Sequence, residues 1–246
     1  MRMKLALYII VISFLFSCSK GNDASPISDG SGKAGSLARF AIVGDNLYTV
    51  TTKDLKIFDI TDAKNPVSKG DIPIGIDIET IFPLDKTLFM GSEGGMYMYD
   101  ISNPLSPRKL SMYEHIRSCD PVVANDKYAF VTLSTTAVRC SRGLNQLEIV
   151  DISDKTRPRI VQVYPMSKPL GMALNGNSLY VCDDVVKWYD ISSIPTLTAK
   201  GSINVKARDA IIVNNIIMLI GEKGLSQYDI SGAQPTFLSQ INIGKI

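Results

Sequence analysis

The sequence predicts an all-β protein, a five-bladed β-propeller with four antiparallel strands in each blade. Two observations lead to this prediction. A short motif, an aromatic or aliphatic residue followed by Asp-Ile-Ser or Asp-Ile-Thr, occurs five times in 246 residues, and four strand-like segments accompany each copy. No stretch beyond the N-terminal leader keeps the 3.6-residue period of an amphipathic helix. Repeats of about 40 residues with four strands are typical of propeller blades.

The first segment, residues 1–17, has the form of a secretory signal peptide. Arg2 and Lys4 precede an apolar run that is shorter than the about 20 residues of a membrane-spanning helix. The run ends in Leu-Phe-Ser followed by Cys18, which resembles the bacterial lipobox. The resemblance implies that Cys18 is acylated and becomes the new N-terminus. The alternative is an ordinary signal peptide with a chance cysteine near its end.

Residues 18–35 are expected to comprise the acylated Cys18 and a flexible tether. The tether is predicted because the residues after Cys18 are mostly Gly, Ser, Asn, Asp and Pro. Ser19 follows the cysteine, whereas in lipoproteins an Asp there often marks retention in the inner membrane. We therefore expect a lipid-anchored protein of the bacterial cell envelope, in the outer membrane. Whether it faces the periplasm or the medium is left open.

The charge balance excludes two classes of partner. The chain has 26 Lys and Arg against 24 Asp and Glu, and removing residues 1–17 leaves 24 of each. A neutral chain has no basic surface for nucleic acid or for anionic lipid headgroups. The expected partners are the membrane, through the lipid, and a protein or glycan of the envelope.

Residues 36–246 are predicted to form one propeller domain of five repeats, at about 36–75, 76–115, 116–168, 169–206 and 207–246. The expected strands of the first repeat are 37–43, 46–51, 55–60 and 67–74. Those of the fourth are 171–175, 178–182, 186–191 and 197–203. They are rich in Val, Ile, Tyr and Thr, and Gly, Asn and Asp separate them, which is a strand-and-hairpin pattern. The sequence does not decide whether the blades close into a ring.

The repeated aspartates are predicted to be structural. They are Asp59, Asp100, Asp151, Asp190 and Asp229, spaced by 41, 51, 39 and 39 residues. The long interval holds an insertion around residues 134–145. Asp and Ser or Thr side chains accept hydrogen bonds from backbone amides just ahead, and the prolines that follow prevent the strand from continuing. The motif therefore ends a strand and shapes a turn.

The third repeat reads LEIVDISDKTRP at 147–158, and this closely resembles the LVIVD repeat of secreted and surface proteins of bacteria and archaea. Copies at 55–66 and 96–107 fit more loosely, and the last two keep the Asp-Ile-Ser core only. The resemblance covers nearly the whole chain after the leader. It implies a β-propeller and no defined activity.

Ligands of propellers usually bind on the face formed by the loops that enter the innermost strand and the loops that join the second and third strands. The candidate binding rim on this channel face is Arg39, Glu79, Arg117, Asp120, Arg208 and Asp209. Alternating charges there suit a polar ligand or a sugar, although mutually paired surface charges explain the same pattern. We predict a non-catalytic binding or scaffolding module. The alternative is an envelope enzyme, with glycans as one candidate substrate class, that uses Glu79, Asp120 and Asp209 as acid and base. A third option is a structural spacer that binds no ligand.

The cysteines predict a disulfide, because the envelope is oxidising. Cys119 starts an inner strand and Cys140 lies in the insertion of the same repeat, so we expect these two to pair. A Cys119–Cys182 bond or three free thiols are the alternatives. No pair has the Cys-x-x-Cys spacing of a zinc or redox site, and His115 is the single histidine. We therefore expect no catalytic residue, no metal and no cofactor.

Overall fold

The computed structural model describes residues 35–115, 121–135 and 144–243. The predicted signal peptide, most of the tether and the candidates Cys18, Arg117, Cys119, Asp120 and Cys140 lie outside these residues. The described chain forms twenty strands, which pair in five four-stranded antiparallel sheets. The all-β, five-bladed propeller predicted from the sequence is therefore confirmed. A search of the described residues for a helix long and apolar enough to cross a membrane finds none.

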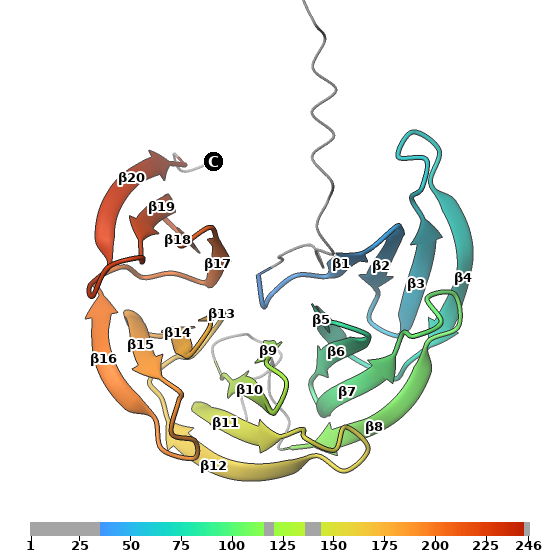
Figure 1. Cartoon of the computed structure of the whole chain (residues 1–246), viewed down its shortest axis with the longest axis horizontal. Helices are drawn as coiled ribbons and strands as arrows, with labels where there is room; N and C mark the ends of the chain where they lie inside the picture. Colours follow the sequence, from blue (N-terminus) through green and yellow to red (C-terminus); the bar gives the residue numbers. More distant parts are fainter. Residues whose placement is uncertain (1–34, 116–120, 136–143, 244–246) are drawn as a thin grey trace, which may run out of the picture.

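The chain builds the blades one after another (Figure 1). Blade 1 consists of β1 (Phe40–Val43), β2 (Asn46–Val50), β3 (Asp54–Asp59) and β4 (Val67–Pro73). Blade 2 consists of β5 (Ile78–Leu84), β6 (Thr87–Ser92), β7 (Gly95–Asp100) and β8 (Arg108–Glu114). Blade 3 consists of β9 (Val122–Ala124), β10 (Tyr128–Leu133), β11 (Gln146–Asp151) and β12 (Arg159–Pro165). Blade 4 consists of β13 (Met172–Asn175), β14 (Ser178–Cys182), β15 (Val186–Asp190) and β16 (Thr198–Ile203). Blade 5 consists of β17 (Asp209–Val213), β18 (Ile216–Gly221), β19 (Gly224–Asp229) and β20 (Thr236–Asn242).

The five motif aspartates share one geometry. Each carboxylate accepts a hydrogen bond of 2.8–3.0 Å from the backbone N–H two residues ahead. The N–H of the isoleucine between them donates to a carbonyl in the hairpin that joins the first two strands of the same blade, as Ile152 does to Lys127 at 2.8 Å. The motif thus ends the third strand in an Asx turn and fastens it to the inner hairpin.

Four hydrophobic clusters hold adjacent blades together. One joins blades 1 and 2, and the others join blades 2 and 3, 3 and 4, and 4 and 5. No cluster of described residues joins blade 5 to blade 1. Figure 1 shows the consequence: the blades form an arc, and the two end blades stand apart at the periphery.

Burial along the second strands shows the same opening. Every residue of β6 in blade 2 is buried, because that blade packs on both sides. In β2 and β18, which belong to the two end blades, buried residues alternate with residues that are partly exposed. Successive side chains of a strand point to opposite faces, so blades 1 and 5 each pack on one face only.

Candidate binding cleft on the channel face

A short segment before β1 connects the two ends of the arc near its axis. Ser36 is fully buried, and its Oγ donates a hydrogen bond of 3.1 Å to the Asp209 carboxylate at the start of β17. The same Oγ accepts a hydrogen bond of 2.7 Å from the Met172 N–H of blade 4. The Leu37 N–H donates to the second Asp209 oxygen at 3.2 Å. Residues of this segment therefore contact blades 4 and 5 although they lead into blade 1.

Two of the predicted rim residues act in contacts between blades. Asp209 accepts the bonds from Ser36 and Leu37, and its burial raises the pKa of the carboxyl, an effect that these hydrogen bonds partly offset. The Arg39 guanidinium donates to the carbonyl oxygens of Val50, at 3.5 Å, and Ile78, at 3.3 Å. Asp209 is thus held within the propeller, whereas Arg39 is an exposed residue that bonds to two carbonyls.

The other two described rim residues are Glu79 and Arg208. Glu79 lies half-buried on β5. Arg208 is exposed and pairs with Glu222 at 3.2 Å. Arg208 is the one predicted rim residue of the described chain that lines the cleft identified below. The described rim candidates therefore do not converge on one site.

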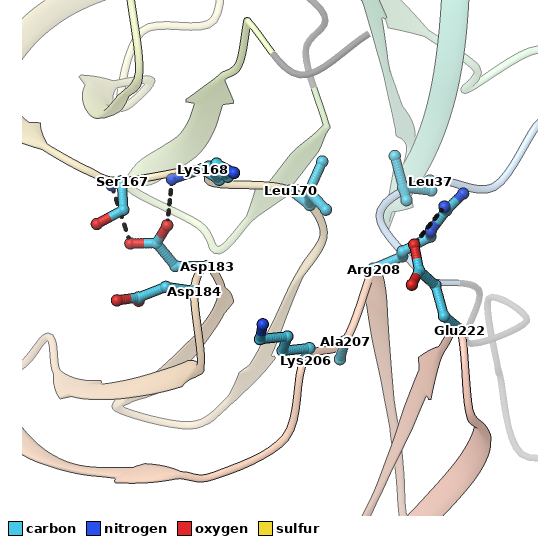
Figure 2. A pocket seen from close by; sticks show the side chains of 10 residues that line it. All are labelled: Leu37, Ser167, Lys168, Leu170, Asp183, Asp184, Lys206, Ala207, Arg208 and Glu222. Carbon is cyan, nitrogen blue, oxygen red and sulfur yellow. Dashed lines mark hydrogen bonds and ion pairs between the residues drawn. The ribbon is translucent and has the colours of Figure 1, made fainter.

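A cleft of about 700 Å³ lies between blades 4 and 5 (Figure 2). Its walls come from the loops that enter β13 and β17 and from the β14–β15 and β18–β19 hairpins. These are the loop types of the channel face, where the sequence predicts ligand binding. The lining residues are Leu37, Ser167, Lys168, Leu170, Asp183, Asp184, Lys206, Ala207, Arg208 and Glu222.

Asp183 is held in place by several donors. Its side chain is fully buried and accepts hydrogen bonds from the backbone N–H groups of Ser167, at 3.2 Å, and Lys168. The Lys187 ammonium lies 2.7 Å from the same carboxylate. Burial alone raises the pKa of Asp183, but the bonds from Lys187 and the two N–H groups outweigh it, so the pKa is below its ordinary value. Asp183 is therefore a fixed anion and a poor proton donor.

The other two acids of the cleft are also paired. Asp184 lies 3.3 Å from the Lys187 ammonium, and Glu222 pairs with Arg208. In contrast, neither the Lys168 nor the Lys206 ammonium pairs with a carboxylate of the described residues. In Figure 2 the Lys206 side chain points into the space between the Asp184 loop and Arg208. The unpaired charge of the cleft is positive.

Sequence reasoning missed most of this site. Lys168, Asp183 and Lys206 belong to no motif and lie in three different loops. The one available signal was their position in the channel-face loops of the fourth and fifth repeats.

Of the three cysteines that follow the predicted tether, Cys182 lies in the described part of the chain. The Cys119–Cys140 pair lies outside the described residues. Cys182, at the end of β14, is free and buried, and Cys119, its partner in the alternative bond, also lies outside the described residues. Burial, and next the nearby Asp209 charge, raise the pKa of its thiol, so it is not a reactive thiolate. Within the described parts of the chain, no three His, Cys, Asp or Glu residues cluster as metal ligands.

The fold and the cleft together define a β-propeller protein with a polar cleft between two blades on its channel face. Residues 142–165, which include all of β11 and β12, match the family model of the LVIVD repeat. The sequence has no match among curated proteins.

Solved structures share the fold. The chain is similar to a functionally unknown protein from Desulfotomaculum acetoxidans, with a TM-score of 0.66, 13% identity and coverage of 87% of this chain and 71% of that one. It is similar to the periplasmic gluconolactonase PpgL of Pseudomonas aeruginosa, with a TM-score of 0.61, 11% identity and coverage of 84% and 68%. It is also similar to the computationally designed protein Ika8, with a TM-score of 0.58, 13% identity and coverage of 80% and 59%. The chain thus spans 59–71% of these longer proteins, and at such identities the likeness shows the fold alone.

Proposed function

We propose that the protein is a lipid-anchored binding module of the bacterial cell envelope, without catalytic activity, and that its cleft between blades 4 and 5 binds a carboxylate group. The carboxylate belongs to an acidic glycan or to an acidic protein segment. The observation that supports this proposal is the pair of unpartnered ammonium groups, Lys168 and Lys206, in a cleft whose acids already have partners.

Electrostatics favour an anion in this cleft. Its three carboxylates face four cations once Lys187, which pairs with two of them, is counted. An ammonium group is strongly hydrated, so a ligand that displaces its water must offer a negative charge in return. Leu37, which lies next to Arg208 (Figure 2), and Leu170 add an apolar border to the cleft, which suits the carbon skeleton of a sugar ring or of an acidic side chain.

The acids of the cleft argue against catalysis. A glycosidase needs one carboxyl that stays protonated and one that is ionised. Asp183 is held ionised by Lys187, and Glu222 is paired with Arg208. Asp209 has a raised pKa, yet Ser36 and Leu37 already occupy its oxygens. The gluconolactonase among the similar structures shares 11% of residues, so its name gives the enzyme alternative little weight.

The proposal is tested by calorimetric titration of the full chain with two probes, an oligosaccharide of uronic acids and a polyglutamate peptide. Neutral oligosaccharides of the same length serve as ligand controls. We expect binding of one acidic probe, and weakening by tenfold or more in Lys168→Gln and Lys206→Gln. Lys200→Gln is the matched control. Lys200 lies on β16 of blade 4, outside the cleft, and pairs with Asp190 at 3.6 Å.

Three outcomes contradict the proposal. The first is equal binding of neutral and acidic oligosaccharides, and the second is binding that the two cleft variants leave unchanged. The third is chemical conversion of the bound probe, detected by NMR of the ligand. That conversion would favour the enzyme alternative.

A further inference from the structure

Blade 5 has one packed face and one uncovered face. Ala210, Ile212, Ile217 and Leu219 belong to the core shared with blade 4. The residues between them in β17 and β18 point to the opposite side, because side chains alternate along a strand. That side belongs to none of the hydrophobic clusters of the described residues.

The strand register shows that most residues of this uncovered side are apolar. One row across the sheet pairs Ile220 with Leu225 and Leu225 with Ile241. We call this surface the terminal face of blade 5, and its members are Ile211, Val213, Ile216, Met218, Ile220, Leu225, Gln227, Ser239 and Ile241. Val213, Ile220 and Ile241 are 37%, 36% and 61% exposed, which is unusual for large aliphatic side chains of one face.

The terminal face has no charge in its middle. Its central polar residues, Gln227 and Ser239, hydrogen-bond to each other at 3.2 Å. Asp209 and Asp229 lie at its two ends, where Asp209 accepts bonds from Ser36 and Leu37, and Asp229 accepts one from the Ser231 N–H at 2.8 Å. A surface of this kind is complementary to another surface that is also mostly apolar and uncharged in its middle.

Blade 1 of the same chain does not cover the terminal face. The contacts of Ser36 and Leu37 with Asp209 keep the segment before β1 against β17. Figure 1 shows the blades diverging outward from there. The uncovered side of blade 1 also differs in chemistry, because one of its rows pairs Thr49 with Lys56 and Lys56 with Asp71. Burying that ion pair against an aliphatic surface would cost desolvation energy.

We propose that the terminal face of blade 5 binds the same face of a second copy, which gives a dimer with two-fold symmetry. An apolar surface whose charges lie only at its ends is complementary to itself, as an isologous interface requires. Four strands about 4.8 Å apart and six residues about 3.4 Å apart span roughly 400 Å² of flat sheet on each copy. Two such faces together give roughly 800 Å² of flat sheet, to which protruding side chains add, so the interface lies at the small end of the range for specific interfaces.

The test is disulfide cross-linking of the full chain in oxidised cells. Gln227 lies in the middle of the terminal face, so Gln227→Cys in two copies falls near the two-fold axis. We expect a reducible band at twice the chain mass that is absent from the unsubstituted chain. Thr49→Cys, on β2 and on the uncovered side of blade 1, is the control and is expected to stay monomeric. Adding Met218→Lys to Gln227→Cys is expected to remove the dimer band.

Three results would overturn the proposal. Gln227→Cys that stays monomeric shows that no second copy covers the face. Equal cross-linking of Thr49→Cys indicates a head-to-tail or unspecific contact. A link within one chain in the double variant Gln227→Cys/Thr49→Cys shows that the arc closes on itself. Fluorescence of Trp188, the single tryptophan, verifies that each variant is folded.

Discussion

Ser36 and Asp209 are 173 positions apart in the sequence and are joined by a hydrogen bond of 3.1 Å. Ser36 precedes the first strand, and Asp209 begins the first strand of the last blade. Leu37, the next residue, contacts the same carboxylate and also lines the cleft between blades 4 and 5. The segment that follows the predicted tether is therefore part of both the propeller axis and the candidate site.

The contact of Ser36 predicts a loss of stability on substitution. Ser36→Ala removes the donor to Asp209 and the acceptor of the Met172 N–H, both in a buried place. Leaving buried polar groups unsatisfied costs about 1–3 kcal/mol. Urea unfolding followed by Trp188 fluorescence measures this loss. Ser68→Ala, on the exposed strand β4, is the control, and an equal effect of both variants would count against the role of Ser36.

Lys187 is predicted to be far more important for stability than Lys200. Lys187→Ala leaves the fully buried Asp183 side chain without its cation, and breaking such a pair costs about 3–5 kcal/mol. Lys200 pairs with Asp190 at 3.6 Å, and both side chains are partly exposed. We expect Lys200→Ala to cost about 0–1 kcal/mol. The same unfolding measurement compares the two, and a difference below about 1 kcal/mol contradicts this prediction.

Gly171 is predicted to be required by the close approach of blades 4 and 5. A Cβ at this position would lie 2.2 Å from an Asp209 carboxylate oxygen and 2.8 Å from the Arg208 carbonyl oxygen. Gly171→Ala is expected to cost about 1–3 kcal/mol through overpacking. Gly94→Ala is the control, because a Cβ there meets nothing within 4 Å. Equal midpoints of thermal unfolding for the two variants would refute the prediction.

Acid is predicted to weaken the propeller through its repeated aspartates. The Thr61 hydroxyl, the Thr61 N–H and Lys69 lower the pKa of Asp59 from 3.8 to about 2. A carboxyl with a lowered pKa in the folded state stabilises the fold above pH 3.8, and this contribution is lost as the pH falls towards about 2. The pKa values of Asp100, Asp151, Asp190 and Asp229 are also lowered, so the losses act in the same direction.

The Asp59→Asn variant isolates one of these contributions. Its urea midpoint should fall less than that of the unsubstituted chain between about pH 5 and about pH 2.5, because an amide does not take up the proton. An unchanged difference between the two proteins across this range would contradict the assigned pKa shift.

The sequence by itself determined the blades. The motif that ends each third strand is local: the Asp151 side chain bonds to the Ser153 N–H, and the Ile152 N–H bonds to the hairpin of its own blade. Alternation of apolar residues also places Ile149 and Leu147 in the core. Such interactions lie within one repeat, so five copies of the pattern predict five blades.

The tertiary structure alone decided the site and the ends of the arc. Lys206 joins Lys168 and Asp183 in one cleft because blades 4 and 5 pack at one angle, and no spacing in the sequence encodes that angle. The binding of Ser36 to Asp209 and the uncovered faces of blades 1 and 5 depend on how curvature accumulates over all the blades. Repeats specify contacts between neighbours, whereas closure and inter-blade clefts depend on the sum of many small rotations.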